Sequence, residues 1–450
     1  MLEQLRIVLA NLREQRRAES LSREQFEGLK LEKFRRLAVH AADRSPYYAR
    51  IVRERGIVPA RCAPGDFPVL TKPELMAHFD EIVTAPGVTK RGIAEFLTTS
   101  HDPSERFLDR YRVIHTSGSS GEVGYFVYSP SDWARGVWPA PRRLRASPPR
   151  RKRGFRKPRF AYYGATDGHY AGVTMVSAFN RGIFKLLVDS ALYEINDPLS
   201  SVLDALNAFR PDYLIGYTTG LKILAEKQLA GLLSISPSLL GTAGEAMTAA
   251  DAALLERAFG CIVTNTYACS EHLGMGTSVP GGREMVLHDH ELIYEFHEDH
   301  TLVTNLFNYT LPLIRYRMAD VLRPIRGKHA YEPYLLVESL IGRNEILPTF
   351  RNRDGVDDFI SPHTINEIFV AGVTRFQMHL LDATRFRFLV CLDPQLDAAQ
   401  RDECVAAVSR RLREILDHKR MDTVDFEVVV AEDLPVDPKT RKFRLIVRQQ

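Results

Sequence analysis

The chain has 450 residues, of which 45% are hydrophobic and 26% are charged, and its formal net charge is +4. This composition is typical of a folded globular protein, and the length predicts a large domain plus a smaller one. A charge so nearly balanced gives little reason to expect nucleic acid as a partner. No apolar run approaches the roughly 18 residues that cross a bilayer, and charges interrupt the N-terminal segment too early for a secretory signal. We therefore expect no membrane span and a cytoplasmic protein.

The predicted elements change character along the chain. The first 55 residues are predicted to be helical up to a Ser-Pro stop, because apolar residues recur at a spacing of three and four. From about residue 110, short β-rich runs such as 159–164 and 261–267 alternate with helical stretches such as 251–259. This alternation is the pattern of an α/β protein with strand-to-helix crossovers.

After about Gly342 the pattern changes to a hairpin at 376–392, an amphipathic helix with Asp397 as its N-cap, and a strand at 423–430. This succession is typical of a small α+β domain. The predicted fold class is therefore α/β, with a large N-terminal domain of mixed sheets and flanking helices (1–342) and a small α+β C-terminal domain (343–450).

The cysteine pattern argues against two structural devices. The five cysteines are odd in number and include no CxxC pair, so neither a disulfide framework nor a zinc site is indicated. We expect reduced thiols, mostly in the core: Cys62, Cys261, Cys269, Cys391 and Cys404.

A strongly basic segment lies between Arg142 and Arg159, with ten Lys or Arg and no acid. One interpretation is a solvated basic loop. The other is a patch that meets the phosphates of CoA or an acidic carrier protein. The sequence does not decide between them.

Three segments carry residues suited to nucleotide chemistry. In the first, residues 115–129 (HTSGSSGEVGYFVYS), a β run breaks into Ser and Gly and then resumes. Glycine lets a backbone approach a ligand, and hydroxyls with exposed N–H groups bind anionic oxygens, so a phosphate-cradling hairpin loop is one interpretation. A flexible turn is the other, because the segment fits neither standard glycine-rich phosphate motif.

The second segment, 265–276 (NTYACSEHLGMG), directly follows a predicted strand. Tyr267 is suited to stack on a base, Ser270 to bond a phosphate and Glu271 to hold Mg²⁺. In the third, 311–321 (LPLIRYRMADV), Asp320 is suited to accept both hydroxyls of a ribose and Arg317 to meet phosphate. The alternatives are an ordinary strand end and a surface ion pair.

The order of these segments, followed by Gly342-Arg343 and a lysine near the C-terminus, resembles the adenylate-forming (ANL) superfamily. The resemblance is greatest to its phenylacetate-CoA ligase and CapK-like branch and covers nearly the whole chain. Similar phrases stand at 40–51, 67–79, 160–170, 210–226, 240–260, 341–350 and 360–369.

The resemblance implies roles for individual residues. Gly244 and Glu245 would lie by the adenine and Tyr267 would stack on it; Ser270 would touch the α-phosphate and Glu271 would bind Mg²⁺. Asp320 would hold the ribose with Arg343 close by. The residues that would wrap the ATP phosphates are Thr116, Ser117, Gly118, Ser119, Ser120 and Gly121.

The resemblance also implies a mobile C-terminal domain that swings about a hinge, with Glu345 as the hinge acid. Lys442 stands where the family has the lysine that bridges acyl and phosphate oxygens, with Lys439 as a rival in the same tail. For either lysine the alternative is a solvated charge. One departure is Glu122, which replaces the lysine that usually follows the loop's last glycine and would repel a triphosphate. The Met318-Ala319 pair replaces the common Thr-Gly, a milder change.

The implied reaction is ATP-dependent activation of a carboxylic acid as its acyl adenylate, with release of pyrophosphate, followed by acyl transfer to CoA or another nucleophile. ATP and Mg²⁺ would be required. Tyr163, His169 and Tyr217 fall in the segments that match the acid pocket, and an aryl or other small hydrophobic acid is a candidate substrate. Isolated aromatics are, however, more often core.

Several alternatives stay open at this point. The acceptor can be a carrier protein or an amine instead of CoA, and Glu122 leaves room for a protein that binds nucleotide without turnover. A homodimer is a candidate assembly. A nicotinamide-dependent oxidoreductase is disfavoured because no glycine fingerprint follows the first strand.

Overall fold

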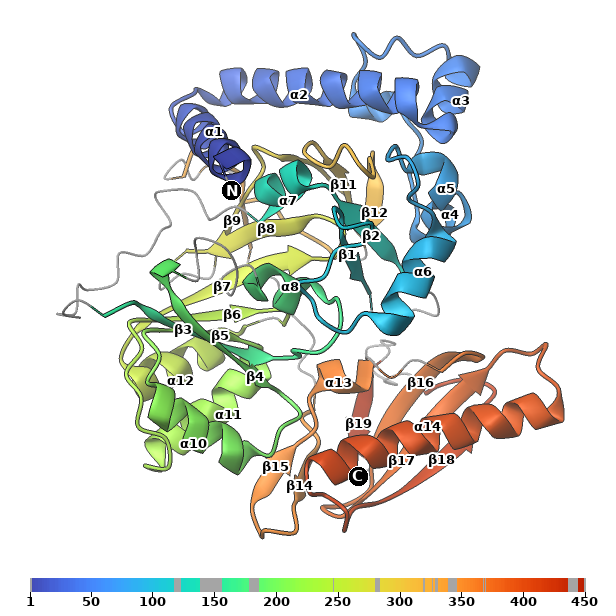
Figure 1. Ribbon diagram of the computed structural model, residues 1–450. Coiled ribbons are helices and arrows are strands. Elements are labelled where there is room, and N and C mark those ends of the chain that lie inside the picture. Colours follow the sequence, from blue (N-terminus) through green and yellow to red (C-terminus); the bar gives the residue numbers. More distant parts are fainter. Residues whose placement is uncertain are drawn as a thin grey trace.

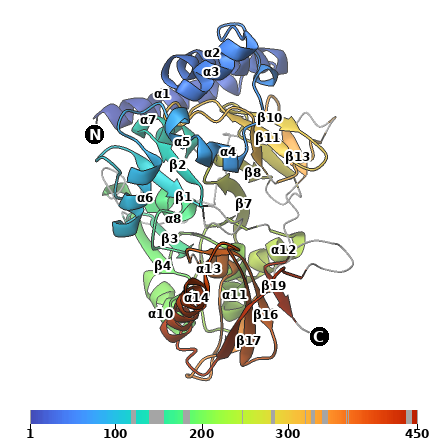
Figure 2. The same ribbon diagram turned by 90° about the vertical axis from the view of Figure 1, so that its right-hand side faces the viewer.

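A computed structural model of the protein describes residues 2–116, 123–137, 156–177, 186–245, 247–279, 284–318, 320–325, 327, 331–338, 346–366, 368, 370–435 and 444–448. Within these ranges the chain forms a large α/β region, with helices across its upper end, and a smaller α+β region at the opposite end (Figures 1 and 2). The predicted fold class is confirmed.

Helices dominate the N-terminal part, as its apolar spacing predicts. The Ser45-Pro46 pair ends one helix but also begins the next, because the Ser45 hydroxyl accepts a hydrogen bond from the Tyr48 backbone N–H at 3.3 Å. Proline fits the first position of a helix, where its missing N–H costs nothing. The predicted stop is therefore a junction between α2 and α3. The helices are α1 (Leu2–Ala18), α2 (Arg23–Arg44), α3 (Pro46–Arg55), the 3₁₀ turn η1 (Pro64–Asp66), α4 (Lys72–Ala77), α5 (Phe79–Ile82) and α6 (Lys90–Thr99).

The main sheet has the strand order β13-β9-β8-β7-β6-β5-β3-β4. Its β4-β3-β5-β6-β7 part is parallel, whereas β8, β9 and β13 add an antiparallel edge. The strands are β3 (Arg159–Gly164), β4 (Asp189–Glu194), β5 (Tyr213–Gly216), β6 (Leu239–Ala243), β7 (Ile262–Cys269), β8 (Leu273–Ser278), β9 (Glu284–Leu287) and β13 (Leu336–Glu338).

Helices cover both faces of the parallel part. On one face α10 (Leu199–Phe209), α11 (Thr218–Leu229) and α12 (Ala249–Phe259) form a core with strand residues such as Tyr163 and Leu240. On the other face α8 (Ala171–Ser177) packs on Phe160 and Tyr162. Neighbouring residues of β3 therefore serve opposite faces, because side chains alternate along a strand.

Two small sheets complete the large region. The antiparallel pair β1 (Arg112–His115) and β2 (Tyr125–Tyr128) flanks the Ser/Gly segment and is followed by α7 (Pro130–Gly136). Strands β10 (Leu292–Phe296), β11 (Thr301–Asn305) and β12 (Tyr316–Met318) form the other sheet.

The residues after 345 build a core of their own. The predicted hairpin, helix and strand are β16 (Val373–Leu380) with β17 (Arg385–Leu392), α14 (Ala398–His418) and β18 (Asp425–Val430); β19 (Ile446–Arg448) completes a sheet of order β18-β17-β16-β19. Asp397 caps α14 as predicted. The remaining elements are β14 (Thr349–Arg351), β15 (Asp357–Phe359) and α13 (Pro362–Asn366). The predicted boundary at 342 lies outside the described residues.

A buried ion pair lies where the two regions meet. Lys419 Nζ is 3.3 Å from Asp358 Oδ1 with both side chains 0% exposed, and it also donates to the carbonyl oxygen of Ile195. Asp358 in turn accepts a hydrogen bond from the backbone N–H of Leu199, the first residue of α10. The ring of Phe359 lies in the core beneath α10 and α11. In this arrangement the C-terminal region is docked on the edge of the large region.

All five cysteines are free thiols, and Cys62, Cys391 and Cys404 are buried, as the sequence predicts. Among the described residues, no helix is long and apolar enough to cross a membrane.

Candidate functional site

The predicted site residues cluster at one edge of the main sheet. Parallel strands β5, β6 and β7 end at the same edge, and each is followed directly by a predicted residue: Tyr217, Gly244 and Ser270. In open α/β sheets, ligands bind in the crevice outside the carboxyl ends of the strands. The topology therefore brings together segments that lie far apart in the sequence.

Tyr267 and Asp320 make the most direct contact within the set. The Tyr267 hydroxyl, on β7, donates a 2.7 Å hydrogen bond to Oδ2 of Asp320, which follows β12. Burial and the neighbouring Asp320 carboxylate hold the pKa of Tyr267 well above its usual value, so the phenol stays a neutral donor. The Tyr267 ring is nearly buried, whereas Asp320 is exposed. An aromatic face and a carboxylate thus border one space.

Glu271 faces the same space. Burial raises the pKa of its carboxyl, the Asp320 carboxylate raises it further, and the Cys269 thiol and Lys72 act in the opposite direction. Two carboxylates that raise each other's energy in this way favour a neighbouring cation. The turn that carries Glu271 is fixed from behind, because the Tyr128 hydroxyl donates to the carbonyl oxygen of Ser270 at 2.5 Å.

Lys72 completes this set, although its role is not evident in the sequence. Its Nζ donates to the Thr116 hydroxyl at 3.1 Å, and the same hydroxyl accepts a 2.8 Å bond from the backbone N–H of Gly124. Thr116 and Gly124 bracket the Ser/Gly loop, so the ammonium lies at the base of that loop. A Cβ at position 124 would stand 3.0 Å from Cε of Lys72 and 3.0 Å from a ring carbon of Phe126, so a larger residue would require both side chains to shift.

One sequence feature does single out Lys72. It is the first residue of α4, where the positive end of the helix dipole disfavours a cation. A charge placed against its local preference points to a function elsewhere.

Gly244 and Glu245 form the turn after β6. Gly244 has a φ of 78°, a left-handed conformation that favours glycine. The Glu245 carboxylate accepts hydrogen bonds from Thr219, 2.6 Å from the backbone N–H and 2.8 Å from the hydroxyl, so its side chain secures the start of α11. Because the Glu245 side chain holds Thr219, the backbone of this turn is the part that can border a ligand.

Two of the three predicted pocket residues, Tyr163 and Tyr217, lie in one buried cluster of the main sheet. Tyr163 is fully buried on the α10–α11 face of the sheet, and burial raises the pKa of its phenol well above the usual value. This position does not favour Tyr163 as a pocket residue. Tyr217 belongs to the same buried cluster as Tyr163, and its ring also packs edge-on against Tyr162 with ring centroids 6.4 Å apart.

His169 lies beside β1, since its carbonyl oxygen accepts a hydrogen bond from the His115 backbone N–H at 3.1 Å. Its Nε2 is 2.7 Å from the hydroxyl of Ser100, and burial lowers the pKa of the imidazole to about 4. The ring is therefore neutral at physiological pH, a form suited to line a pocket rather than to pair with a carboxylate.

Arg317 is not directed at the site. Its guanidinium pairs with Asp299 at 3.1 Å on the exposed surface. The surface ion pair considered from the sequence does form, with Asp299 as the partner in place of Asp320.

Several predicted residues lie outside the described residues: Ser117, Gly118, Ser119, Ser120, Gly121, Glu122, Arg343, Glu345, Lys439, Lys442 and all but the last part of the basic segment. The described parts hold no group of three His, Cys, Asp or Glu that would bind a metal ion unaided.

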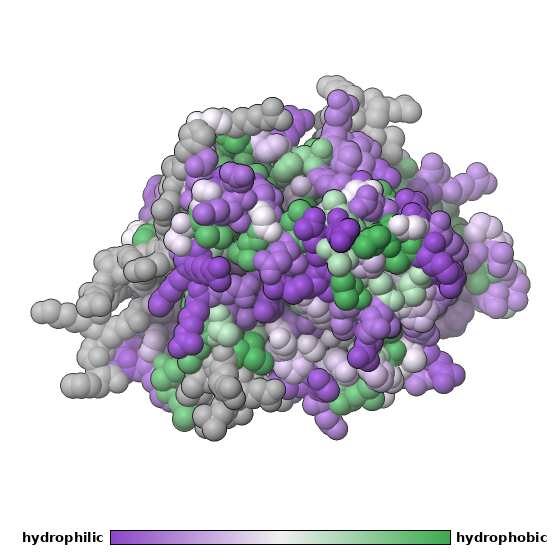
Figure 3. All heavy atoms as spheres, turned by 90° about the horizontal axis from the view of Figure 1, so that it is seen from above, coloured by the Kyte–Doolittle hydropathy of each residue, from purple (hydrophilic) through white to green (hydrophobic). Residues whose placement is uncertain are grey.

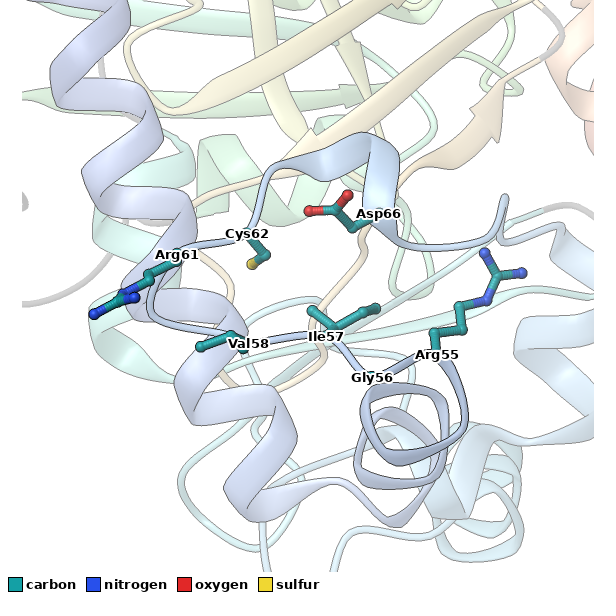
Figure 4. A pocket seen from close by; sticks show the side chains of 7 residues that line it. All are labelled: Arg55, Gly56, Ile57, Val58, Arg61, Cys62 and Asp66. Carbon is teal, nitrogen blue, oxygen red and sulfur yellow. The ribbon is translucent and has the colours of Figure 1, made fainter.

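A hollow of about 460 Å³ beside the end of α3 is a separate feature (Figure 4). None of the predicted site residues lines it. Its Cys62 thiol has a pKa raised by burial, which disfavours a reactive thiolate. The lining residues are Arg55, Gly56, Ile57, Val58, Arg61, Cys62 and Asp66.

Comparison with known proteins gives a distant relative and a shared fold. No family model matches the chain. Protein CapK of Staphylococcus aureus is 26% identical in an alignment 211 positions long that covers 41% of this chain and 46% of CapK. The chain thus aligns with less than half the length of that relative.

Among solved structures, 2-hydroxyisobutyryl-CoA ligase is similar over nearly the whole chain. Its complex with 2-HIB-AMP and CoA in the thioesterification state gives a TM-score of 0.58 at 17% identity, covering 96% of this chain and 91% of the ligase. Its postadenylation state with 2-HIB-AMP gives 0.53 at 15% identity, covering 96% and 92%. These likenesses show the fold.

Proposed function

We propose that this chain, an ANL-superfamily protein by its fold and a distant homologue of CapK, activates a carboxylic acid with ATP and passes the acyl group to a nucleophile. The superfamily resemblance read from the sequence is confirmed at that level. The observation that carries the proposed activity is the shared space of Tyr267, Asp320, Glu271, Lys72 and Thr116 at the sheet edge.

Each of these residues is suited to one part of MgATP. The Tyr267 ring offers an apolar face for adenine, and Asp320 offers acceptors for ribose hydroxyls. The Thr116 hydroxyl and the Ser/Gly loop offer donors for phosphate oxygens. Glu271 is the residue that would hold Mg²⁺, and the ion would neutralise charge as pyrophosphate leaves.

The chemistry is an in-line displacement at the α-phosphorus. A carboxylate oxygen of the acid forms the new P–O bond, the bond to the bridging oxygen breaks, and pyrophosphate departs with its electron pair. Two anions must approach each other, so cations have to be in place beforehand. We assign this task to Lys72, and to Lys442 on the strength of the family resemblance.

Lys72 can also supply the positive charge that the family's loop lysine usually provides. Glu122 stands where the family usually has a cation, whereas the Lys72 ammonium reaches the base of the same loop from α4. A cation supplied from outside the loop would offset the added carboxylate. This assignment favours an active enzyme over a protein that only binds nucleotide.

For the second step we propose attack of a thiol or amine on the acyl carbon, with AMP as the leaving group. CoA is the first acceptor to test, because the ligase with the similar fold is bound to CoA. The phenylacetate-CoA ligase type, and an aryl acid, are the finer form of the proposal. A carrier protein is the alternative acceptor.

The test is acid-dependent exchange of labelled pyrophosphate into ATP over a panel that includes aryl, aliphatic and 2-hydroxy acids. Exchange with at least one acid, lost in Lys72→Met, would support the proposal. Acyl adenylate formed in this way, mixed with CoA or an amine, would identify the acceptor. Tight ATP binding without exchange for any acid would show a nucleotide-binding protein without turnover.

A further inference from the structure

A second, larger cavity lies away from the sheet edge. It has a volume of about 880 Å³ and is enclosed by α1, α2, α7 and the segment 306–309. Small-molecule sites typically measure about 300–1,000 Å³. In Figure 1, α7 lies beneath α1 and α2, the two helices that line the cavity with it. Figure 3 shows the outer face seen from above, where hydrophilic residues predominate with smaller apolar areas between them.

Cations outnumber acids around this cavity, with five basic and three acidic side chains in its lining. Arg13 and Arg17 of α1 are exposed, and neither has an ion pair within the described part of the chain. They lie one helical turn apart, so they share one face of the helix. Two guanidinium groups are therefore available to an anion.

The acids in the lining already have partners. Lys33 Nζ is 2.7 Å from Oε1 of Glu14, and Arg36 is 3.0 Å from Glu32. Asp132 accepts a hydrogen bond from the Thr310 hydroxyl at 2.5 Å. Glu14 and Glu32 are thus paired with cations of the same lining, whereas Asp132 is hydrogen-bonded and keeps its charge. Among the described residues, Arg13 and Arg17 have no acid partner.

The inner wall is apolar. Leu306 and Phe307 are almost fully buried and line the cavity, and Tyr309 also lines it. The Tyr309 phenol faces Arg36, Arg135 and Lys33, all of which lower its pKa, although burial raises it more. A ligand here meets cations at one end and an apolar surface at the other.

The cavity is distinct from the nucleotide site. The Phe307 ring stacks on Tyr128 with centroids 6.5 Å apart, and the Tyr128 hydroxyl reaches the carbonyl oxygen of Ser270. A stacked aromatic pair thus separates the two spaces. We propose that the cavity is a second binding site, for a small organic anion with an apolar body and a carboxylate, phosphate or sulfonate head.

The test uses the full chain and 8-anilinonaphthalene-1-sulfonate, an aryl anion whose fluorescence rises on binding. Arg13→Glu/Arg17→Glu should weaken its affinity about tenfold or more, since two attractive charges become repulsive. The matched control Arg16→Glu/Arg53→Glu has the same change in net charge at exposed positions outside the cavity and should change the affinity less than about twofold.

Two further measurements distinguish the contribution of the charges to binding from the contribution of the cavity itself. N-phenyl-1-naphthylamine, which lacks the sulfonate, should bind both double variants equally well. Ser131→Trp, which places a large ring at an exposed lining position, should reduce binding of both probes. Equal loss in the two double variants, no saturable binding to the native chain, or no effect of Ser131→Trp would overturn the proposal.

Discussion

Replacing Lys72 with methionine tests the composition of the proposed ATP site most directly. Methionine keeps much of the apolar stem that packs against Gly124 but removes the ammonium. The ammonium is at hydrogen-bond distance from Thr116, 3.1 Å. A phosphate oxygen held by that hydroxyl would come within about 4 Å of the charge, where two unit charges interact by about 4 kcal/mol at an effective dielectric constant of 20.

The net loss will be smaller than this figure. Lys72 also interacts with the Glu271 carboxylate, which lowers its effect on phosphate, and water will partly replace the lost ammonium. The loss of one positioned donor to a developing anion typically costs about 3 kcal/mol. We therefore expect Lys72→Met to slow pyrophosphate exchange about a hundredfold at saturating acid.

The control is Lys227→Met, which removes a lysine near the far end of α11 and should leave exchange within about twofold. Unfolding midpoints of the two variants should be similar, so a loss of exchange cannot be ascribed to misfolding. If Lys72→Met keeps near-native exchange while its unfolding midpoint is unchanged, Lys72 does not act on the phosphates.

Three further predictions follow from the site and from the joint between the regions. Lys442→Ala should reduce pyrophosphate exchange about a hundredfold, roughly 3 kcal/mol, while ATP binding measured by calorimetry persists; undiminished exchange would transfer the role to Lys439. Glu271→Gln should abolish exchange yet raise the unfolding midpoint at pH 7, because folding raises the pKa of Glu271 and so penalises its charged form above the unfolded pKa; a lower midpoint would contradict this sign. Lys419→Met should destabilise the protein by about 3–5 kcal/mol, because it leaves the buried Asp358 carboxylate uncompensated, whereas Lys222→Met, at the partly exposed Lys222–Asp251 pair, should cost about 1 kcal/mol or less; similar costs in denaturant melts would refute the difference.

Local signals explain why much of the fold was predictable. The period of 3.6 with Asp397 at the cap defines α14, and the predicted runs at 159–164 and 261–267 coincide with β3 and β7. The strand order was not predictable, because pairing depends on contacts between distant segments. The antiparallel edge β8-β9-β13 illustrates this, since β13 follows β9 in the sheet but is separated from it in the chain by three strands of another sheet.

The site residues were predictable where one residue type is suited to one role. They were less predictable where the role depends on which way a side chain points. Tyr267 and Asp320 were selected by type and family order, and their side chains do meet. Tyr163 and Tyr217 are predicted as pocket residues from their segments, but both lie in a buried core cluster. Lys72 lies in the family-like segment 67–79, but its contact with the loop was not predictable because the two are 44 residues apart in sequence.

Any large rotation of the C-terminal region must break the contacts that dock it on the large region. Lys419 donates to carbonyl oxygens of Ile195 and Asp197 in the large region while it pairs with Asp358. A rotation would separate the ammonium from those carbonyls and expose part of a buried charged pair to water. Because water solvates such a pair well, the net cost is far smaller than that of removing one partner. The pair therefore favours the docked orientation without preventing separation of the two regions, which is compatible with the proposed two-step reaction and with the domain motion that the family resemblance implies.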